Sequence, residues 1–181
     1  VRVFRGQPAG GIETTGTELT VGNGPIAVTA GDLDQDGLVD MACADLGAWT
    51  LTICHGRPGG TFAAPQTVPV DGPPSDIAIA DVTGDGIPDV LVALFDRAAI
   101  SVFIGRSNGE LGDEIQLGTS GLPLRLDTAD FDGDGFRDVV TSGLHTDKLS
   151  LFRGAHSGPV GGANYATGRN TPNFTAQADF D

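Results

Sequence analysis

Aspartate recurs at alternate positions of a nine-residue segment that occurs three times in the chain, over 32–40, 81–89 and 130–138. Each copy begins 49 residues after the one before it (81 − 32 and 130 − 81). Carboxylates at positions one, three and five of a tight loop converge on one point, and glycine at position six permits the sharp turn. The main-chain carbonyl at position seven and the carboxylate at position nine can complete the shell. This all-oxygen set suits Ca²⁺ better than Mg²⁺, which requires a stricter octahedron.

We therefore expect one Ca²⁺ in each complete loop, or three ions in all. The expected ligands, with position seven acting through its carbonyl, are Asp32, Asp34, Asp36, Leu38 and Asp40; Asp81, Thr83, Asp85, Ile87 and Asp89; and Asp130, Asp132, Asp134, Phe136 and Asp138. A fourth copy starts at Asp179 and Asp181, which are expected ligands as well. Thr83 replaces a carboxylate, and affinity follows ligand charge, so the second loop should bind most weakly.

An EF-hand, a soft-metal site and a plain turn all fit these loops less well. An EF-hand requires Glu at position twelve, where this chain has Cys43, Val92 and Thr141. The flanking residues alternate as strands do and show no helical period. Softer metals prefer His or Cys, and neither lies within the loops. Asp and Gly are also common turn formers, but three copies in register favour a metal site.

The composition limits the classes of partner. The net charge is −14, and thirteen of the 24 acidic residues lie in the loops and the fourth fragment. Three bound Ca²⁺ would bring the net charge to about −8. Nucleic acid is excluded as a partner by the sign of the charge, and no apolar run is long enough for membrane insertion. Cys43 and Cys54 could form a cross-strand disulfide, although two buried thiols are favoured.

The repeat extends beyond the loops and predicts an all-β fold. Short alternating runs on both sides of each loop predict four antiparallel strands in about 49 residues, the pattern of β-propeller blades. The predicted units are 1–25 (outer two strands of a partial blade), 26–73, 74–122 and 123–171 (whole blades), and 172–181 (a first strand and the start of a metal loop). The ring is thus incomplete in this chain. We expect this chain to be part of a longer parent chain or to self-associate.

A second element supports a family resemblance. Phe-x-Gly follows the predicted third strand at 4–6, 103–105 and 152–154, whereas the first whole unit has Cys54, His55 and Gly56 there. Together with the Asp loops, this pattern resembles FG-GAP/VCBS repeats, the calcium-binding blades of integrin α-subunit propellers and of many secreted proteins. The resemblance implies an extracellular location, either secreted or at the cell surface. It also implies a ligand face made by the loops between second and third strands, with the candidates Trp49, Phe95, Arg97, His145 and Asp147.

Two functions follow as hypotheses. The first is a calcium-stabilised binding or scaffold module for adhesion or ligand recognition, with a protein or glycan partner. The alternative is the propeller portion of a secreted enzyme, or a carbohydrate-binding lectin. The three His residues fall at unrelated repeat positions and no nucleophile–base motif appears, so we expect no enzyme activity. A lectin would repeat an aromatic platform in each blade, and Trp49 and Tyr165 have no counterparts in the other units.

Overall fold

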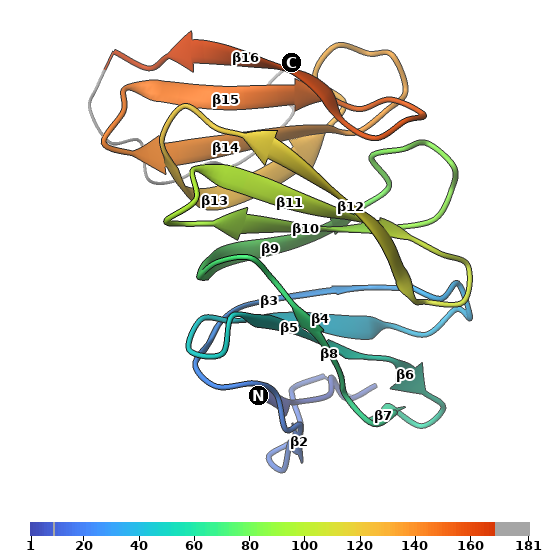
Figure 1. The fold of residues 1–181 in the computed structure, drawn as a ribbon. Helices are drawn as coiled ribbons and strands as arrows, with labels where there is room; N and C mark the ends of the chain where they lie inside the picture. Colours follow the sequence, from blue (N-terminus) through green and yellow to red (C-terminus); the bar gives the residue numbers. More distant parts are fainter. Residues whose placement is uncertain (9, 169–181) are drawn as a thin grey trace.

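The computed structural model describes residues 1–8 and 10–168, and its regular structure consists of β-strands. Three four-stranded antiparallel sheets are stacked one on another, as Figure 1 shows. In each sheet the strands lie in sequence order, so every connection joins neighbours. This arrangement confirms the all-β prediction of four strands per repeat. Among the described residues there is no helix long and apolar enough to cross a bilayer.

The strand bounds follow the repeat. The first sheet contains β3 (Pro25–Gly31), β4 (Asp40–Asp45), β5 (Thr50–Cys54) and β8 (Gln66–Pro69). The second contains β9 (Pro74–Ala80), β10 (Asp89–Leu94), β11 (Ala99–Gly105) and β12 (Leu111–Gly118). The third contains β13 (Leu122–Ala129), β14 (Asp138–Leu144), β15 (Lys148–Arg153) and β16 (Val160–Ala166). A short N-terminal pair, β1 (Arg2–Val3) and β2 (Thr17–Glu18), lies beyond the first sheet.

The apolar core lies between the sheets, and the middle sheet is buried on both faces. Val90 and Val92 of β10 pack against residues of the first sheet, whereas Leu91 packs towards Val139 and Phe152 of the third. All three β10 side chains are fully buried. A strand buried on both faces is expected to be apolar at every position rather than at alternate ones. Each such side chain contributes about 1.5–3 kcal/mol relative to an exposed one.

The first strands of neighbouring sheets pack against each other: β3 contacts β9, and β9 contacts β13. Two side chains of β9 also bridge to β13. The Ser75 hydroxyl donates to the Pro123 carbonyl (2.8 Å), and the Leu126 amide donates to Asp76 Oδ2 (2.9 Å). These bonds hold neighbouring sheets in register where they crowd together. The loops at the ends of these strands are therefore presented side by side.

The first sheet differs from the others in two ways. A small hairpin, β6 (Gly56–Arg57) with β7 (Thr61–Phe62), precedes β8, where the repeat predicts a turn. It forms because Gly59 and Gly60 both adopt positive φ (79° and 68°), which reverses the chain within three residues. Cys43 and Cys54 lie on the neighbouring strands β4 and β5 as buried free thiols. Burial raises the pKa of the Cys43 thiol to about 11.

Candidate functional site

The three Asp loops connect the first and second strands of the three sheets. They lie between β3 and β4, between β9 and β10, and between β13 and β14. Because the sheets share one topology and their inner strands adjoin, all three loops lie at the same end of the stack. The turns between second and third strands lie at the opposite end.

Each loop is folded by hydrogen bonds from its own main chain to its own carboxylates. The glycine amide at position six donates to the aspartate at position one, and the amide at position seven donates to the aspartate at position five. The first bond joins Gly37 to Asp32 (2.9 Å), Gly86 to Asp81 (2.8 Å) and Gly135 to Asp130 (3.0 Å). The second joins Leu38 to Asp36 (2.8 Å), Ile87 to Asp85 (2.8 Å) and Phe136 to Asp134 (2.9 Å). These bonds turn the acidic side chains towards the inside of the loop.

The aspartate at position nine is buried and fastens the loop to the sheet. Asp40, Asp89 and Asp138 are all 0 % exposed. Each accepts one amide from loop position two and one from the glycine at the end of the third strand or just after it. The distances are 2.8 and 2.6 Å from Leu33 and Gly56, 3.0 and 2.8 Å from Val82 and Gly105, and 2.9 and 3.0 Å from Phe131 and Gly154. Burial raises the pKa of Asp89, and the amides of Gly105 and Val82 oppose that rise.

This contact explains the glycine of the Phe-x-Gly element, to which the sequence alone assigns no role. A Cβ on Gly105 would collide with the Pro88 carbonyl, at loop position eight. Gly56 and Gly154 meet the corresponding carbonyls in the first and third loops. Only glycine lets the third strand approach this closely and still donate its amide to the position-nine carboxylate.

Carboxylates of the first and third loops form clusters that fit a cation. Asp32, Asp34 and Asp36 each place a carboxylate oxygen within 4.8 Å of the others, and so do Asp130, Asp132 and Asp138. Among the described residues, Asp32 Oδ1 is buried without a hydrogen-bond partner. A buried oxygen of this kind is costly unless something supplies positive charge. The donor set therefore fits a hard divalent ion.

The second loop is different. Thr83 is 4 % exposed, and its hydroxyl donates to Asp81 Oδ1 (3.2 Å). Within the described part of the chain, no acidic trio of this loop comes together as in the other two. Position three of this loop thus contributes a hydroxyl bonded to Asp81 instead of a carboxylate, and its weaker calcium binding stays a prediction.

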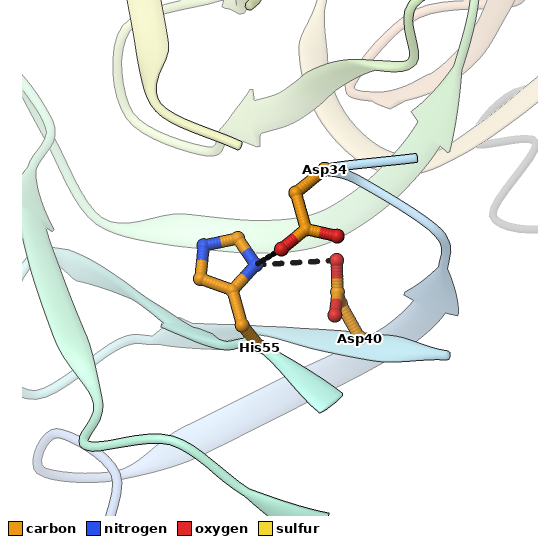
Figure 2. A group of neighbouring side chains, drawn as sticks. All are labelled: Asp34, Asp40 and His55. Atoms are coloured by element: carbon orange, nitrogen blue, oxygen red, sulfur yellow. Dashed lines mark hydrogen bonds and ion pairs between the residues drawn. The ribbon is translucent and has the colours of Figure 1, made fainter. Parts of the chain in front are cut away.

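A side chain next to the third strand reaches two carboxylates of the first loop, a contact that the sequence did not predict. His55 Nδ1 lies 3.2 Å from Asp40 Oδ2 and 3.6 Å from Asp34 Oδ2, as Figure 2 shows. At the equivalent position of the third sheet, Arg153 Nη1 lies 3.2 Å from Asp132 Oδ2. The second sheet has Ile104 there. The signal in the sequence was the residue before the Phe-x-Gly glycine, which is basic where position three is Asp and apolar where it is Thr.

The loops also contact one another. The Gln35 side-chain amide donates to the Gly86 carbonyl, which joins the first loop to the second. The Phe136 ring lies against Gly84, where no Cβ would fit, and stacks edge-on with His156 at 4.7 Å. The loops therefore form a continuous row across the three sheets.

Comparison with known proteins supports this interpretation of the repeat. The FG-GAP-like repeat matches residues 32–92 and 81–141, which together span more than half of the chain. The chain belongs to the FG-GAP-like repeat family. The resemblance inferred from the Asp loops is thus confirmed, whereas no curated protein matches the chain.

The FG-GAP-like chain is also similar to solved structures. The crystal structure of BBS1N in complex with ARL6DN, soaked with mercury, has 18 % identity and a TM-score of 0.61, covering 88 % of this chain and 49 % of that chain. The same complex soaked with lead has 18 % identity and a TM-score of 0.55, covering 84 % and 46 %. The likeness is one of fold and confirms β-propeller blades. The chain spans about half the length of these structures.

The five ligand-face candidates occupy corresponding turns of the FG-GAP-like blades. Trp49, 48 % exposed, lies between β4 and β5. Phe95 and Arg97 lie between β10 and β11, and His145 and Asp147 between β14 and β15. Arg97 is held by Asp71, with Nη2 to Oδ1 at 3.1 Å, so its charge is partly matched within the chain. A role of these residues in binding stays a prediction.

The predicted unit 172–181, with Asp179 and Asp181, lies outside the described residues. The ligand sets of the three complete loops and the boundaries of the units likewise stay predictions. What the structure adds is a division among the expected ligands. The aspartate at position nine accepts main-chain amides from the loop and from the third strand, and in the third loop it also belongs to the carboxylate cluster.

Proposed function

We propose that the chain is a calcium-stabilised β-propeller module that recognises another molecule outside the cell. The observation that carries the calcium assignment is the first loop, where three carboxylates converge and Asp32 Oδ1 is buried without a donor. FG-GAP-like repeats commonly bind calcium. The chain offers oxygen ligands in each loop and a main-chain carbonyl at position seven, the set that Ca²⁺ favours. Ligand distances of about 2.3–2.6 Å are expected.

Calcium would stabilise the fold by neutralising clustered charge. Without the ion, four carboxylates in the first loop and four in the third repel one another. An ion that binds only the folded state adds RT ln(1 + [L]/Kd) to the free energy of unfolding. For extracellular sites of about 10⁻⁴ to 10⁻³ M, millimolar Ca²⁺ should add about 0.5–1.5 kcal/mol at each loop. Across three loops this corresponds to several degrees in melting temperature.

The experiment is thermal unfolding of the full chain in excess chelator, in millimolar Ca²⁺ and in millimolar Mg²⁺. We expect the melting temperature to rise with Ca²⁺ and to rise much less with Mg²⁺. The variant Asp32→Asn should reduce the rise, whereas Asp113→Asn, at an exposed acid on β12 outside the loops, should leave it unchanged. Identical melting curves in chelator and Ca²⁺ would show that the loops are plain turns. Calorimetry should count three ions for the three complete loops.

The recognition surface is proposed at the opposite end of the blades. Trp49 is the single Trp of the chain and is half exposed in a turn. Aromatic side chains carry much of the binding energy at protein interfaces. The similar BBS1N structure was crystallised with ARL6DN, which supports a protein partner for a module of this fold. Glycan arrays and binding assays with secreted proteins, using wild-type and Trp49→Ala chains, would test whether Trp49 belongs to that surface.

We also propose that the module carries out no catalysis. Thirteen of its 24 acidic groups lie in the three loops and the fourth fragment, and the three His residues lie at unrelated blade positions. A panel of hydrolase and lyase substrates tests this proposal. The proposal would be contradicted if the chain turned over a substrate, and if a substitution in the turns between second and third strands abolished that turnover while calcium binding stayed intact.

A further inference from the structure

We propose that the first loop, unlike the other two, is a mixed nitrogen and oxygen site that binds a borderline transition dication such as Zn²⁺ through His55, Asp34 and Asp40. The proposal deepens the proposed function, since it rests on the first loop being a metal site; Zn²⁺ would share Asp34 and Asp40 with Ca²⁺, so the two ions compete for this loop. His55 Nδ1 and one oxygen of each aspartate lie within 4.8 Å of one another. Figure 2 shows the imidazole edge turned towards both carboxylates.

The distances fit a small tetrahedral ion. Zn²⁺ lies about 2.0–2.2 Å from nitrogen and carboxylate ligands, so neighbouring ligand atoms in a tetrahedron are roughly 3.3–3.5 Å apart. His55 Nδ1 lies 3.2 Å from Asp40 Oδ2 and 3.6 Å from Asp34 Oδ2. Three protein ligands with one open position is a common arrangement for zinc. Imidazole nitrogen suits Zn²⁺ and its neighbours in the transition series much better than it suits Ca²⁺.

The carboxylate of Asp40 can take part without giving up its structural bonds. Its two oxygens accept amides from Gly56 (2.6 Å, to Oδ1) and Leu33 (2.8 Å, to Oδ2). A carboxylate has about four acceptor sites, so Oδ2 keeps one for an ion. Those two amides also fix the orientation of the carboxylate, as bonds behind a metal ligand usually do.

The imidazole is held in place by the neighbouring blade. His55 is 7 % exposed, and a Cβ on Gly109, in the turn before β12, would collide with its ring. Gly109 adopts a φ of 77°, so its conformation and its lack of a side chain both suit glycine. The His55 imidazole is therefore already held between two blades, next to both carboxylates, in a position to bind a metal ion through Nδ1.

The other blades lack this donor. Arg153, at the equivalent position, cannot ligate a metal because its guanidinium stays protonated. Ile104, at the equivalent position of the second blade, has no polar atom, and the loop of that blade has Thr83 in place of Asp. Ile104 and Arg153 therefore serve as internal controls for His55, because they occupy the same position in the other two blades.

The test is Zn²⁺ titration of the full chain against a competing chromophoric chelator, with Co²⁺ absorption as a second readout. We expect one tight Zn²⁺ and the visible absorption of four-coordinate Co²⁺. His55→Ile, which copies the second blade, should weaken Zn²⁺ binding at least tenfold and remove the Co²⁺ signal. His55→Gln keeps a hydrogen-bond donor for Asp40, so it should retain the fold but lose the zinc site. Adding Thr83→Asp with Ile104→His should create a second site.

Unchanged Zn²⁺ affinity in His55→Gln, or no stoichiometric Zn²⁺ in the wild type, would overturn the proposal and leave His55 as a hydrogen-bond donor to Asp40. Calcium-dependent melting is measured on the same proteins. If it persists in the His55 variants while zinc binding never appears, the zinc proposal alone has failed. If zinc binds and Ca²⁺ stabilises neither protein, the calcium proposal alone has failed.

Discussion

The aspartates at the two ends of each Asp loop have different roles. At the buried end, Asp89 is fully enclosed and accepts two main-chain amides. At the exposed tip, Asp85 accepts one amide from its own loop and faces solvent. The first carboxylate is a structural part of the sheet whether or not an ion is present. The second adds negative charge near Asp89, whose pKa burial raises and this charge helps to raise, until an ion neutralises that charge. Removing each in turn should therefore have different consequences.

The largest expected effect is that of Asp89→Ala on metal-free stability. The change leaves the buried amides of Val82 and Gly105 without an acceptor, at about 1–3 kcal/mol each. We expect the free energy of unfolding to fall by about 2–4 kcal/mol in chelator, measured by urea denaturation. Asp85→Ala, in the same loop, should change it by less than about 1 kcal/mol and should instead lower calcium affinity. Equal losses for the two variants in chelator would remove the distinction between the ends.

A second, smaller effect is expected from restoring charge to the second loop. Thr83→Asp adds the missing carboxylate and should tighten calcium binding there by about tenfold, since affinity follows ligand charge. Thr83→Asn, which adds an oxygen but no charge, is the matched control and should change little. In the first loop, Asp36→Ala should cost more affinity than Thr83→Ala does in the second. Calorimetry that found the wild-type second site as tight as the others would contradict the charge argument.

Much of this molecule could be predicted because its repeats coincide in register. Three loops 49 residues apart implied three like sheets, and the alternating flanks implied strands. The contact of His55 with Asp34 and Asp40 could not be predicted in the same way. It depends on how closely the third strand passes behind the loop, and that distance is set by Gly56. The β6–β7 hairpin was missed because the conformations of Gly59 and Gly60 depend on local geometry that spacing does not report.

The burial of position nine was also missed. The pattern showed Asp40, Asp89 and Asp138 as equivalent to the other carboxylates, because residue type carries no information on depth. Only the folded chain shows that the amides reaching them come from two directions, the loop itself and the third strand. The Asp loops were thus predicted from the sequence, but the different burial of their carboxylates was not.

The smallest expected effect is a difference in titration between buried Asp89 and exposed Asp130 in metal-free protein. Burial raises the pKa of Asp89, whereas the amide of Gly135, above all, lowers the pKa of exposed Asp130, at position one of the third loop. For Asp89 the folded state holds its proton more tightly than the unfolded chain. Its contribution to stability therefore falls as pH rises from the ordinary pKa through the raised one. For Asp130 the sign is opposite: its contribution is present above the ordinary pKa and is lost as pH falls through the lowered one.

Carboxyl ¹³C chemical shifts, followed by NMR across the acid range in chelator, measure both groups in one sample. We expect Asp89 to titrate above the ordinary aspartate value of 3.8 and Asp130 below it. Titration of Asp89 below Asp130 would mean that its amide bonds outweigh its burial, and that the buried end of the loop is already arranged to hold charge before any ion arrives.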